Sequence, residues 1–301
     1  MEKKINFSSL FGKANIFSIL VFSISVLFII FKGLNYGIDF KGGTLIELRV
    51  DNSINISDLR SSFTKMNLGD VNVKEFGKKG DYLIKIEKSN EENPNFVNEL
   101  KSNIKKSIGE EVNFRRVEKV GPKVSNELLQ SGLIAIILSL AAMLFYIWIR
   151  FEWQFSVGSI IALFHDVIIT VGVFSLLSFE INLSIIAAVL TIVGYSMNDT
   201  VVIYDRIREN LSKFSKLNID EISDLSINET LSRTIITSVT TLLALFSIFI
   251  LGGEILKGFS FAMILGVIIG TYSSIFVASP VLKFFKVSYK TMQKEEEKIV
   301  P

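Results

Sequence analysis

The stretch ALFHDVIITVG, residues 162–172, places the only histidine of the chain beside an aspartate in the middle of an apolar run. The run extends from Phe155 to Phe179, and a helix needs about 20 residues to cross the hydrocarbon core of a membrane. Inserting an aspartate at the centre of such a helix costs about 2.5 to 3.5 kcal/mol. His165 and Asp166 therefore need polar surroundings, which favours a bundle of membrane helices with a functional site inside it.

The composition of the chain agrees with a membrane protein. Its 301 residues are 49% hydrophobic, with 25 phenylalanines and a mean hydropathy of +0.45, which is too apolar for an ordinary soluble domain. The formal net charge of +2 gives no indication of a nucleic-acid-binding surface. Cysteine is absent, which excludes disulfides, thiolate metal sites and cysteine nucleophiles.

Six apolar runs are long enough, or nearly so, to span a bilayer. They are Ala14–Phe31, Gly132–Ile149, Phe155–Phe179, Ile181–Tyr204, Thr234–Leu251 and Phe259–Leu282. Lysines precede the first run, but this run is longer than the core of a signal peptide and no cleavage motif follows it. We therefore expect a retained anchor and a polytopic α-helical membrane protein with six transmembrane helices.

The lysines and arginines that flank these runs predict the orientation in the membrane. They concentrate in the N-terminal segment, at Arg150, in residues 205–233 and in the tail 283–301, whereas the short loops on the opposite side contain only Lys257. Both termini are therefore predicted to be cytoplasmic. The cytoplasmic loop 205–233 is expected to contain a short amphipathic helix along the membrane surface, with Ile219, Ile222, Leu225 and Leu231 on its apolar face.

Residues 32–131, between segment 1–31 and the helical region 132–282, are predicted to form an extracytoplasmic domain. Strand patterns occur in TLIELRV (44–50), VNVKEF (71–76), YLIKIE (82–87) and VNFRRVEKV (112–120). One helix is expected after a Ser57 cap, with Leu59, Phe63 and Met66 inside. A second is expected after Asn93 and Pro94, with Phe96, Leu100, Ile104 and Ile108 inside. The order strand, helix, strand, strand, helix, strand predicts a ferredoxin-like α+β fold.

The polar residues inside the predicted helices form a candidate proton relay. Spacing by four places Gly158, Ala162, Asp166 and Thr170 on one stripe, so Asp166 is expected to face the bundle. Removal from water favours the protonated form of a carboxyl, which releases its proton when a cation approaches. The polar residues of the next apolar run, Ile181–Tyr204, are expected to lie between the level of Asp166 and the cytoplasm. We predict a relay of His165, Asp166, Asn198, Asp199, Asp205 and Arg206, with Glu180 as a further candidate for proton access at the outer side.

Simpler roles for these residues stay open. Asp166 fits a neutral, hydrogen-bonded carboxyl, Asn198 and Asp199 fit helix contacts, and Arg206 fits a cytoplasmic anchor. An intramembrane protease would require Asp166 and Asp199 to meet across facing helices. One histidine without a ligand at the third or fourth following residue makes a poor metal site, and no nucleotide-binding loop is present, so we expect no metal, no cofactor and no enzyme.

Small residues predict tight packing and turns. Gly194, Gly266, Gly270 and Ser274 are expected at close helix contacts. Asp39 is expected to cap a turn in which Gly42 and Gly43 adopt conformations that other residues avoid. Gly121 and Pro122 are expected to form a hinge or helix start where the outside domain joins the second span.

Five motifs, in order along the chain, resemble the SecF family of Sec translocon accessory subunits, in the SecD/SecF group. They are GIDFKGGT (37–44), VGPKVSNEL (120–128), HD (165–166), GYSMNDTVVIYDRIREN (194–210) and GTYSSIFVASP (270–280). The family is similar in architecture to half of an RND-like transporter, which implies six spans with a soluble domain between the first two.

The resemblance implies a bacterial inner-membrane protein that assists export of unfolded polypeptides by using the proton-motive force. It implies SecD as a separate partner chain and association with the SecYEG channel and with YajC. It also implies that His165 and Asp166 match the intramembrane proton site of the family, with Arg206 as the countercharge. The alternatives are an RND-like exporter of lipids or small molecules and a purely structural subunit.

Overall fold

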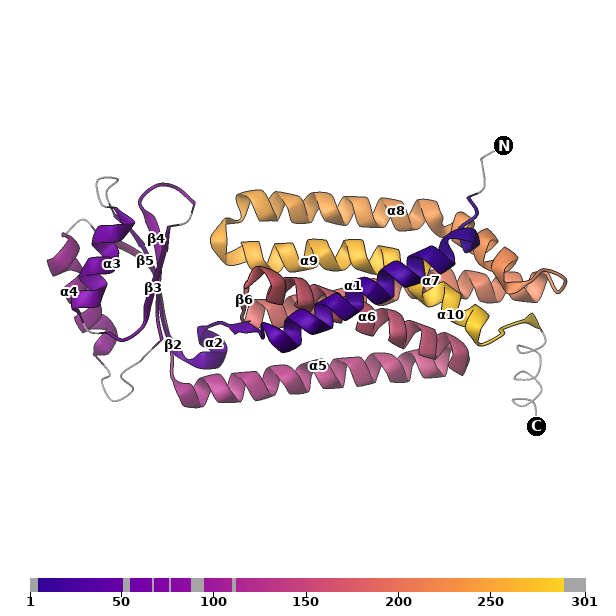
Figure 1. The fold of residues 1–301 in the computed structure, drawn as a ribbon, viewed down its shortest axis with the longest axis horizontal. Coiled ribbons are helices and arrows are strands. Elements are labelled where there is room, and N and C mark those ends of the chain that lie inside the picture. The colour runs from indigo at the N-terminus through magenta and orange to yellow at the C-terminus, as the bar shows by residue number, and fades with distance from the viewer. Residues whose placement is uncertain are drawn as a thin grey trace. The chain divides into compact units, whose positions relative to one another are not determined.

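The computed structural model describes residues 5–50, 55–66, 68–75, 77–87, 95–109 and 112–289. The chain divides into two compact units, which Figure 1 draws as a helical bundle and a small sheet covered by helices. The helical unit comprises residues 1–34, 136–179 and 185–301. The sheet unit comprises residues 35–135 and 180–184.

Six helical segments among the described residues are long and apolar enough to cross a membrane, as the sequence predicts. The first joins a 3-10 turn, Ser8–Leu10, to α1, Phe11–Phe31, and the sixth is made of α9, Gly253–Ser273, a π-helix, Ser274–Ala278, and α10, Ser279–Phe284. Between them lie α5 (Pro122–Arg150), α6 (Trp153–Leu177), α7 (Leu183–Lys213) and α8 (Ile219–Leu251). The second begins at Pro122, directly after Gly121, because proline suits the first turn of a helix.

The predicted loop at residues 205–233 is mostly helical, so the expectation of a separate amphipathic helix there is wrong. Helix α7 continues to Lys213, and α8 begins at Ile219 and runs without a break into the fifth span. Asn218 and Glu221 form a reciprocal capping box that fixes this start. Ile222 is buried in the main apolar core of the bundle instead of facing a membrane surface.

Small residues bring the helices close together. Helix α1 packs across α6, α8 lies along α9 (Figure 1), and α6 also contacts α9. A Cβ atom on Gly158 would overlap the Tyr204 hydroxyl, one on Gly266 would overlap Ile192, and one on Gly270 would meet Ser196 at 3.0 Å. The buried stripe of α6 also includes Ala162 and Thr170.

The sheet unit confirms the predicted ferredoxin-like fold. Its order is β2 (Gly43–Arg49), α3 (Ile56–Lys65), β3 (Val71–Glu75), β4 (Asp81–Ile86), α4 (Phe96–Ile108) and β5 (Asn113–Val120). The strands are arranged β3-β4-β2-β5, and all neighbouring strands are antiparallel. Leu59 and Phe63 of α3 and Leu100 and Ile104 of α4 are buried on one face of this sheet.

The predicted helix starts in this unit need correction. Asn55, not Ser57, occupies the N-cap position of α3, and Asn95 occupies that of α4. Neither side chain makes a capping hydrogen bond. Asn93 and Pro94 lie outside the described residues, as does Phe76 of the predicted hairpin.

A short connection at the edge of the sheet unit contains the paired glycines. Strand β1, Asn35–Tyr36, pairs with β6, Glu180–Ile181, and the single turn α2, Ile38–Lys41, follows β1. Gly42 and Gly43 have φ values of +77° and +133°, and a Cβ on Gly43 would lie 2.5 Å from the Ile86 carbonyl oxygen. Asp39 does not cap this turn; its carboxylate accepts the backbone N–H of Leu183, the first residue of α7, at 2.9 Å.

Candidate functional site

Asp166 lies at the point where three membrane helices meet. Its side chain, on α6, is completely buried. One carboxyl oxygen, Oδ2, accepts hydrogen bonds from Ser196 Oγ of α7 at 2.5 Å and from Ser273 Oγ of α9 at 2.7 Å. The other, Oδ1, lies 2.9 Å from His165 Nδ1. Hydrogen bonds to these groups offset the cost of removing the carboxyl from water.

His165 connects Asp166 to a second polar group. The residue is 6% exposed, and its ring stacks on the ring of Tyr272, with centroids 6.4 Å apart. The Tyr272 hydroxyl donates to the Ala14 carbonyl oxygen and lies 2.9 Å from Ser18 Oγ, both on α1. His165 Nε2 is buried and has no hydrogen-bond partner within the described residues. A line of polar side chains therefore runs from Asp166 to α1.

Asp199 provides a second buried carboxyl one helical turn beyond Ser196. It is 2% exposed, and its Oδ2 has no hydrogen-bond partner in the part of the chain that the structure describes. The side chains of Asn198 and Thr271 lie within hydrogen-bonding reach of this carboxyl, and the positive charge of Arg233 on α8 acts on it. Thr271 also hydrogen-bonds Ser238 at 2.7 Å, which ties α9 to α8.

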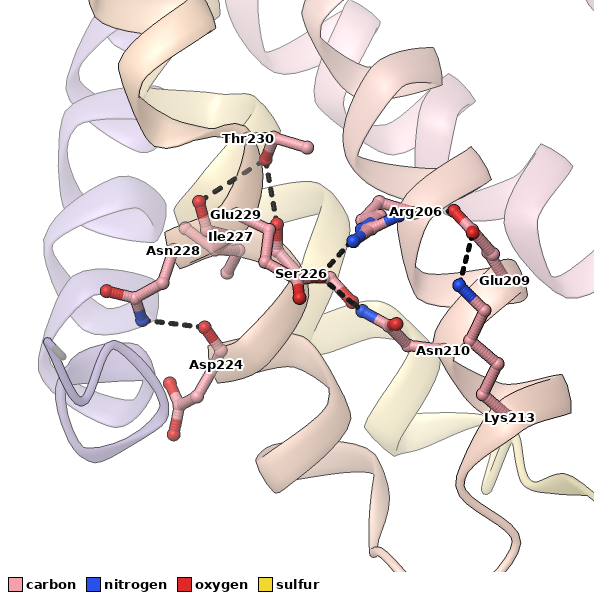
Figure 2. Close-up of polar contacts among 10 residues, drawn as sticks. All are labelled: Arg206, Glu209, Asn210, Lys213, Asp224, Ser226, Ile227, Asn228, Glu229 and Thr230. Atoms are coloured by element: carbon pink, nitrogen blue, oxygen red, sulfur yellow. Dashed lines mark hydrogen bonds and ion pairs between the residues drawn. The ribbon is translucent and has the colours of Figure 1, made fainter.

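Asp205 and Arg206 belong to the end of the bundle where α7 meets α8. Asp205 forms an ion pair with Arg150 at 3.2 Å. Arg206 bonds Glu229 at 2.6 Å and Glu209 at 2.5 Å, and Asn210 reaches the same Glu229 oxygen (Figure 2). These partners hold Arg206 away from Asp166, so the structure does not bring together the pair that the resemblance implies.

The remaining predicted positions are dispersed. Asn198 is exposed on α7, with its side chain within reach of the neighbouring Asp199 carboxyl. The nearest neighbour that a Cβ on Gly194 would meet is Met143 of α5, at 3.6 Å. Ser274 donates to the Thr271 carbonyl oxygen of its own helix. In the sheet unit, Glu180 lies 3.6 Å from Lys85 Nζ.

Sequence reasoning missed the residues that bind Asp166 from other helices. Ser196 and Ser273 stand inside the quoted motifs at 194–210 and 270–280, but serine is common at helix contacts and gave no separate signal. Arg233 stands at the start of an apolar run, four residues after Glu229, where a positive charge predicts only the orientation of the following membrane helix.

The fold and this site together define a class of protein. The chain is a multi-pass membrane protein built as six helices with a ferredoxin-like domain between the first and second, and it holds a buried carboxyl among three of the helices. Residues 100–288 match the family described as "Protein export membrane protein SecD/SecF, C-terminal", and residues 27–54 match the "SecD/SecF GG Motif". The chain belongs to the SecD/SecF family.

Relatives within this family cover most of the chain. It is 46% identical over 270 residues to "Protein translocase subunit SecF" of Rickettsia rickettsii, covering 89% of this chain and 88% of the relative. The protein of the same description from Vibrio alginolyticus is 44% identical over 279 residues, covering 92% and 89%. Both relatives are described as SecF subunits, so within the SecD/SecF family this chain is similar to SecF.

A solved structure has the same fold. It is SecDF of Thermus thermophilus, described as a translocon-associated membrane protein, with a TM-score of 0.85 and 35% identity. The match covers 95% of this chain and 39% of that longer chain. A structure of SecDF in the super-membrane-facing form matches with a TM-score of 0.70 and 33% identity, covering 99% of this chain and 40% of that one.

Proposed function

We propose that this chain is the SecF subunit of a bacterial protein translocase and couples the proton-motive force to protein export. The observation that carries the proposal is the setting of Asp166, a fully buried ionisable group that is hydrogen-bonded to three side chains. Hydroxyl groups donate and accept hydrogen bonds, and imidazole can also take up or release a proton, so this cluster suits the loading and release of a proton at Asp166. The subunit performs this work without covalent catalysis and without a cofactor or metal.

The proposed relay passes from Asp166 through Ser196 to Asp199. Ser196 contacts Asp166, and Asp199 follows three residues later on α7, about 4.5 Å further along the helix axis. One elementary charge that crosses 100 mV gains about 2.3 kcal/mol, comparable with the cost of burying a carboxylate. The membrane potential is therefore sufficient to drive a change in the charge of this pair.

Arg233 is the better candidate for the countercharge than Arg206. The charge of Arg233 acts on Asp199 through space and favours its ionised form, whereas Arg206 is already paired with Glu209 and Glu229. We therefore assign Arg206 and Asp205 to a network that stabilises the cytoplasmic end of the bundle. His165 is proposed to connect Asp166 with Tyr272 and α1.

The orientation follows the positive charges, with both termini cytoplasmic and the ferredoxin-like domain outside the cytoplasmic membrane. Contacts within the helical unit support the shared side of the termini. Ile5 and Ser8 bind Asn228 and Asp224 near the start of α8, and Lys283 binds Asp220 there as well.

The proposed partners are a separate SecD chain, the SecYEG channel and, as an accessory protein, YajC. The exposed amide of Asn198 supports a partner on α7, because a polar side chain in a membrane helix is costly against lipid. Unfolded polypeptide segments are the proposed clients of the outside domain.

The test replaces Asp166 by asparagine, which keeps the shape of the side chain but removes its ability to ionise. Export of a preprotein into vesicles that contain the chain, SecD and SecYEG is measured with and without an imposed proton gradient. We expect Asp166→Asn to lose the gradient-stimulated part of export while the complex assembles normally. Asp58→Asn, an exposed residue of the sheet unit, is the matched control and should keep this stimulation.

Each alternative has a distinct outcome in the same experiment. Unchanged stimulation in Asp166→Asn contradicts proton coupling at this residue and favours a structural subunit. Gradient-driven efflux of lipids or small molecules that depends on Asp166, without an effect on export, favours an exporter.

A further inference from the structure

Tyr204 is a fully buried residue of α7 whose hydroxyl reaches across the bundle. Its hydroxyl donates to the Ala278 carbonyl oxygen at 2.8 Å, and its ring packs edge-on against Phe155, with centroids 5.1 Å apart. A side chain at residue 158 of α6 would occupy the space of this hydroxyl, which only glycine leaves free. Three helices therefore meet at one buried phenol, and the proposed relay does not use it.

The partner of Tyr204 is the last residue of an irregular segment. Residues Ser274–Ala278 form a π-helix between α9 and α10. Pro280 follows and lacks a backbone N–H, while Ser279 Oγ donates to the Ser274 carbonyl oxygen across the segment. A π turn accommodates one extra residue, which shifts the helical phase by about 100° relative to an uninterrupted helix.

The residue before this segment is Ser273, whose hydroxyl binds Asp166. Ser273 is the last residue of α9, so the rotation of its side chain relative to Ala278 and α10 includes the phase shift that the π-helix introduces. Tyr204 holds one end of the π-helix, and Asp166 is bonded at the other. Both contacts are completely buried.

We propose that Tyr204 is a positioning residue for the proton site: its hydrogen bond to Ala278 holds the π-helix in the phase that directs the Ser273 hydroxyl at Asp166. This inference rests on the proposed function only for its effect on export. The geometric coupling from Tyr204 to Asp166 is testable by itself. Conversely, protonation changes at Asp166 act through the π-helix on α10, where Lys283 is bonded to Asp220 of α8.

The test measures the infrared band of the Asp166 carboxyl in the purified complex with SecD, isolated as the difference from Asp166→Asn. The frequency of this band reports the hydrogen bonds that the carboxyl accepts. We expect Tyr204→Phe, which removes only the hydroxyl, to shift the band in the same direction as Ser273→Ala. Tyr195→Phe is the matched control on the same helix, because the Tyr195 hydroxyl is buried without a hydrogen-bond partner among the described residues.

The same variants are assayed for export. Gradient-stimulated export should fall about fivefold in Tyr204→Phe, the change expected from the loss of one hydrogen bond, and stay at the wild-type level in Tyr195→Phe. An unshifted band in Tyr204→Phe beside a shifted band in Ser273→Ala overturns the inference, as does an equal shift in Tyr195→Phe.

Two further cases are covered by an additional variant and by the infrared measurement. If Tyr204→Phe fails to assemble, Ser279→Ala removes the other bond that fixes the π-helix, and it should shift the band in the same direction; an unchanged band then rejects the inference. If the proton gradient does not stimulate export in the wild-type complex, the proposed function is wrong. The infrared measurement alone then decides whether Tyr204 positions Ser273.

Discussion

At the scale of single residues, the two buried carboxyls of the bundle, Asp166 and Asp199, differ in their hydrogen bonds. Asp166 has three such contacts, whereas Asp199 has an unpartnered oxygen within the described residues and a nearby arginine. An unsatisfied buried oxygen costs about 1 to 3 kcal/mol. Asp199 is therefore the less stabilised of the two carboxyls, which supports its place in the proposed relay.

Asp81 of the sheet unit shows the opposite, purely structural use of a buried carboxylate. Arg49 donates two hydrogen bonds of 2.6 Å to it, and Arg115 lies 3.4 Å away. The hydrogen-bonded Arg49 holds the pKa of Asp81 below its usual value. A lowered pKa means that the ion pair stabilises the fold above the unfolded-state pKa, about 3.9, and that this contribution is lost as the pH falls through the folded-state pKa.

We therefore expect acid to destabilise the sheet unit through Asp81. Amide hydrogen exchange of β2 and β4 in the full chain, corrected for the intrinsic rate, should show decreasing protection as the pH falls below about 4. Asp81→Asn should be less protected at neutral pH and less sensitive to acid. Glu99→Gln in α4 serves as the comparison, and an identical acid response in wild type and Asp81→Asn would contradict this assignment.

At the scale of elements, the helices are positioned by contacts that leave no room for a side chain. Gly172 of α6 faces α1, and an added Cβ would lie 2.7 Å from the Ser25 Cα. This neighbour is backbone and cannot move without separating the helices. Ser175 of α6 adds hydrogen bonds to the carbonyl oxygens of Phe28 and Gly33 at the end of α1.

Gly172→Ala should therefore destabilise the packing of α1 on α6. The expected cost is about 1 to 3 kcal/mol, the usual penalty for overpacking, seen as a lower Tm of the purified protein. Gly12→Ala in α1 is the matched control, since a Cβ there meets nothing within 4 Å. Alanine is the better helix former, so this control should be neutral or slightly stabilising, and equal losses in both variants would refute the packing argument.

At the scale of the whole molecule, the first and last described segments of the helical unit are bonded near the start of one helix. Asn228 bonds both the backbone N–H and the carbonyl oxygen of Ile5, Asp224 bonds Ser8, and Lys283 reaches Asp220, all on α8. Figure 2 includes Asp224 and Asn228 beside the Arg206 network of the same region. The first, fifth and sixth spans are thus joined where α7 meets α8.

The proposed orientation predicts the labelling of single cysteines, which is unambiguous because the chain contains none. Lys216→Cys lies in the exposed connection between α7 and α8, and Lys79→Cys in the exposed turn between β3 and β4. A membrane-impermeant maleimide added to intact cells should label Lys79→Cys and spare Lys216→Cys, with the reverse in inside-out vesicles. The opposite pattern would invert the proposed topology.

Local patterns were sufficient to predict much of the fold. Apolar runs predicted six membrane helices, and alternating and helical periodicities predicted the ferredoxin-like unit with Leu59, Phe63, Leu100 and Ile104 inside. The loop prediction at 205–233 failed because charged residues at a helix end resemble a loop. The structure shows that α8 begins after the cap at Asn218 and that Ile222, in its first turn, packs in the core of the bundle.

The sequence by itself determined that Asp166 needs polar partners inside a membrane, because the cost of burying a carboxyl depends on its own chemistry and on the apolar run around it. Only the tertiary structure decided which partners those are. Ser196 and Ser273 lie 30 and 107 residues away, and Tyr204 meets Ala278 across 74 residues. Small residues spaced by four predict that a helix is closely packed, but the pattern within one helix does not identify the partner helix, and the π turn has no periodic signal of its own.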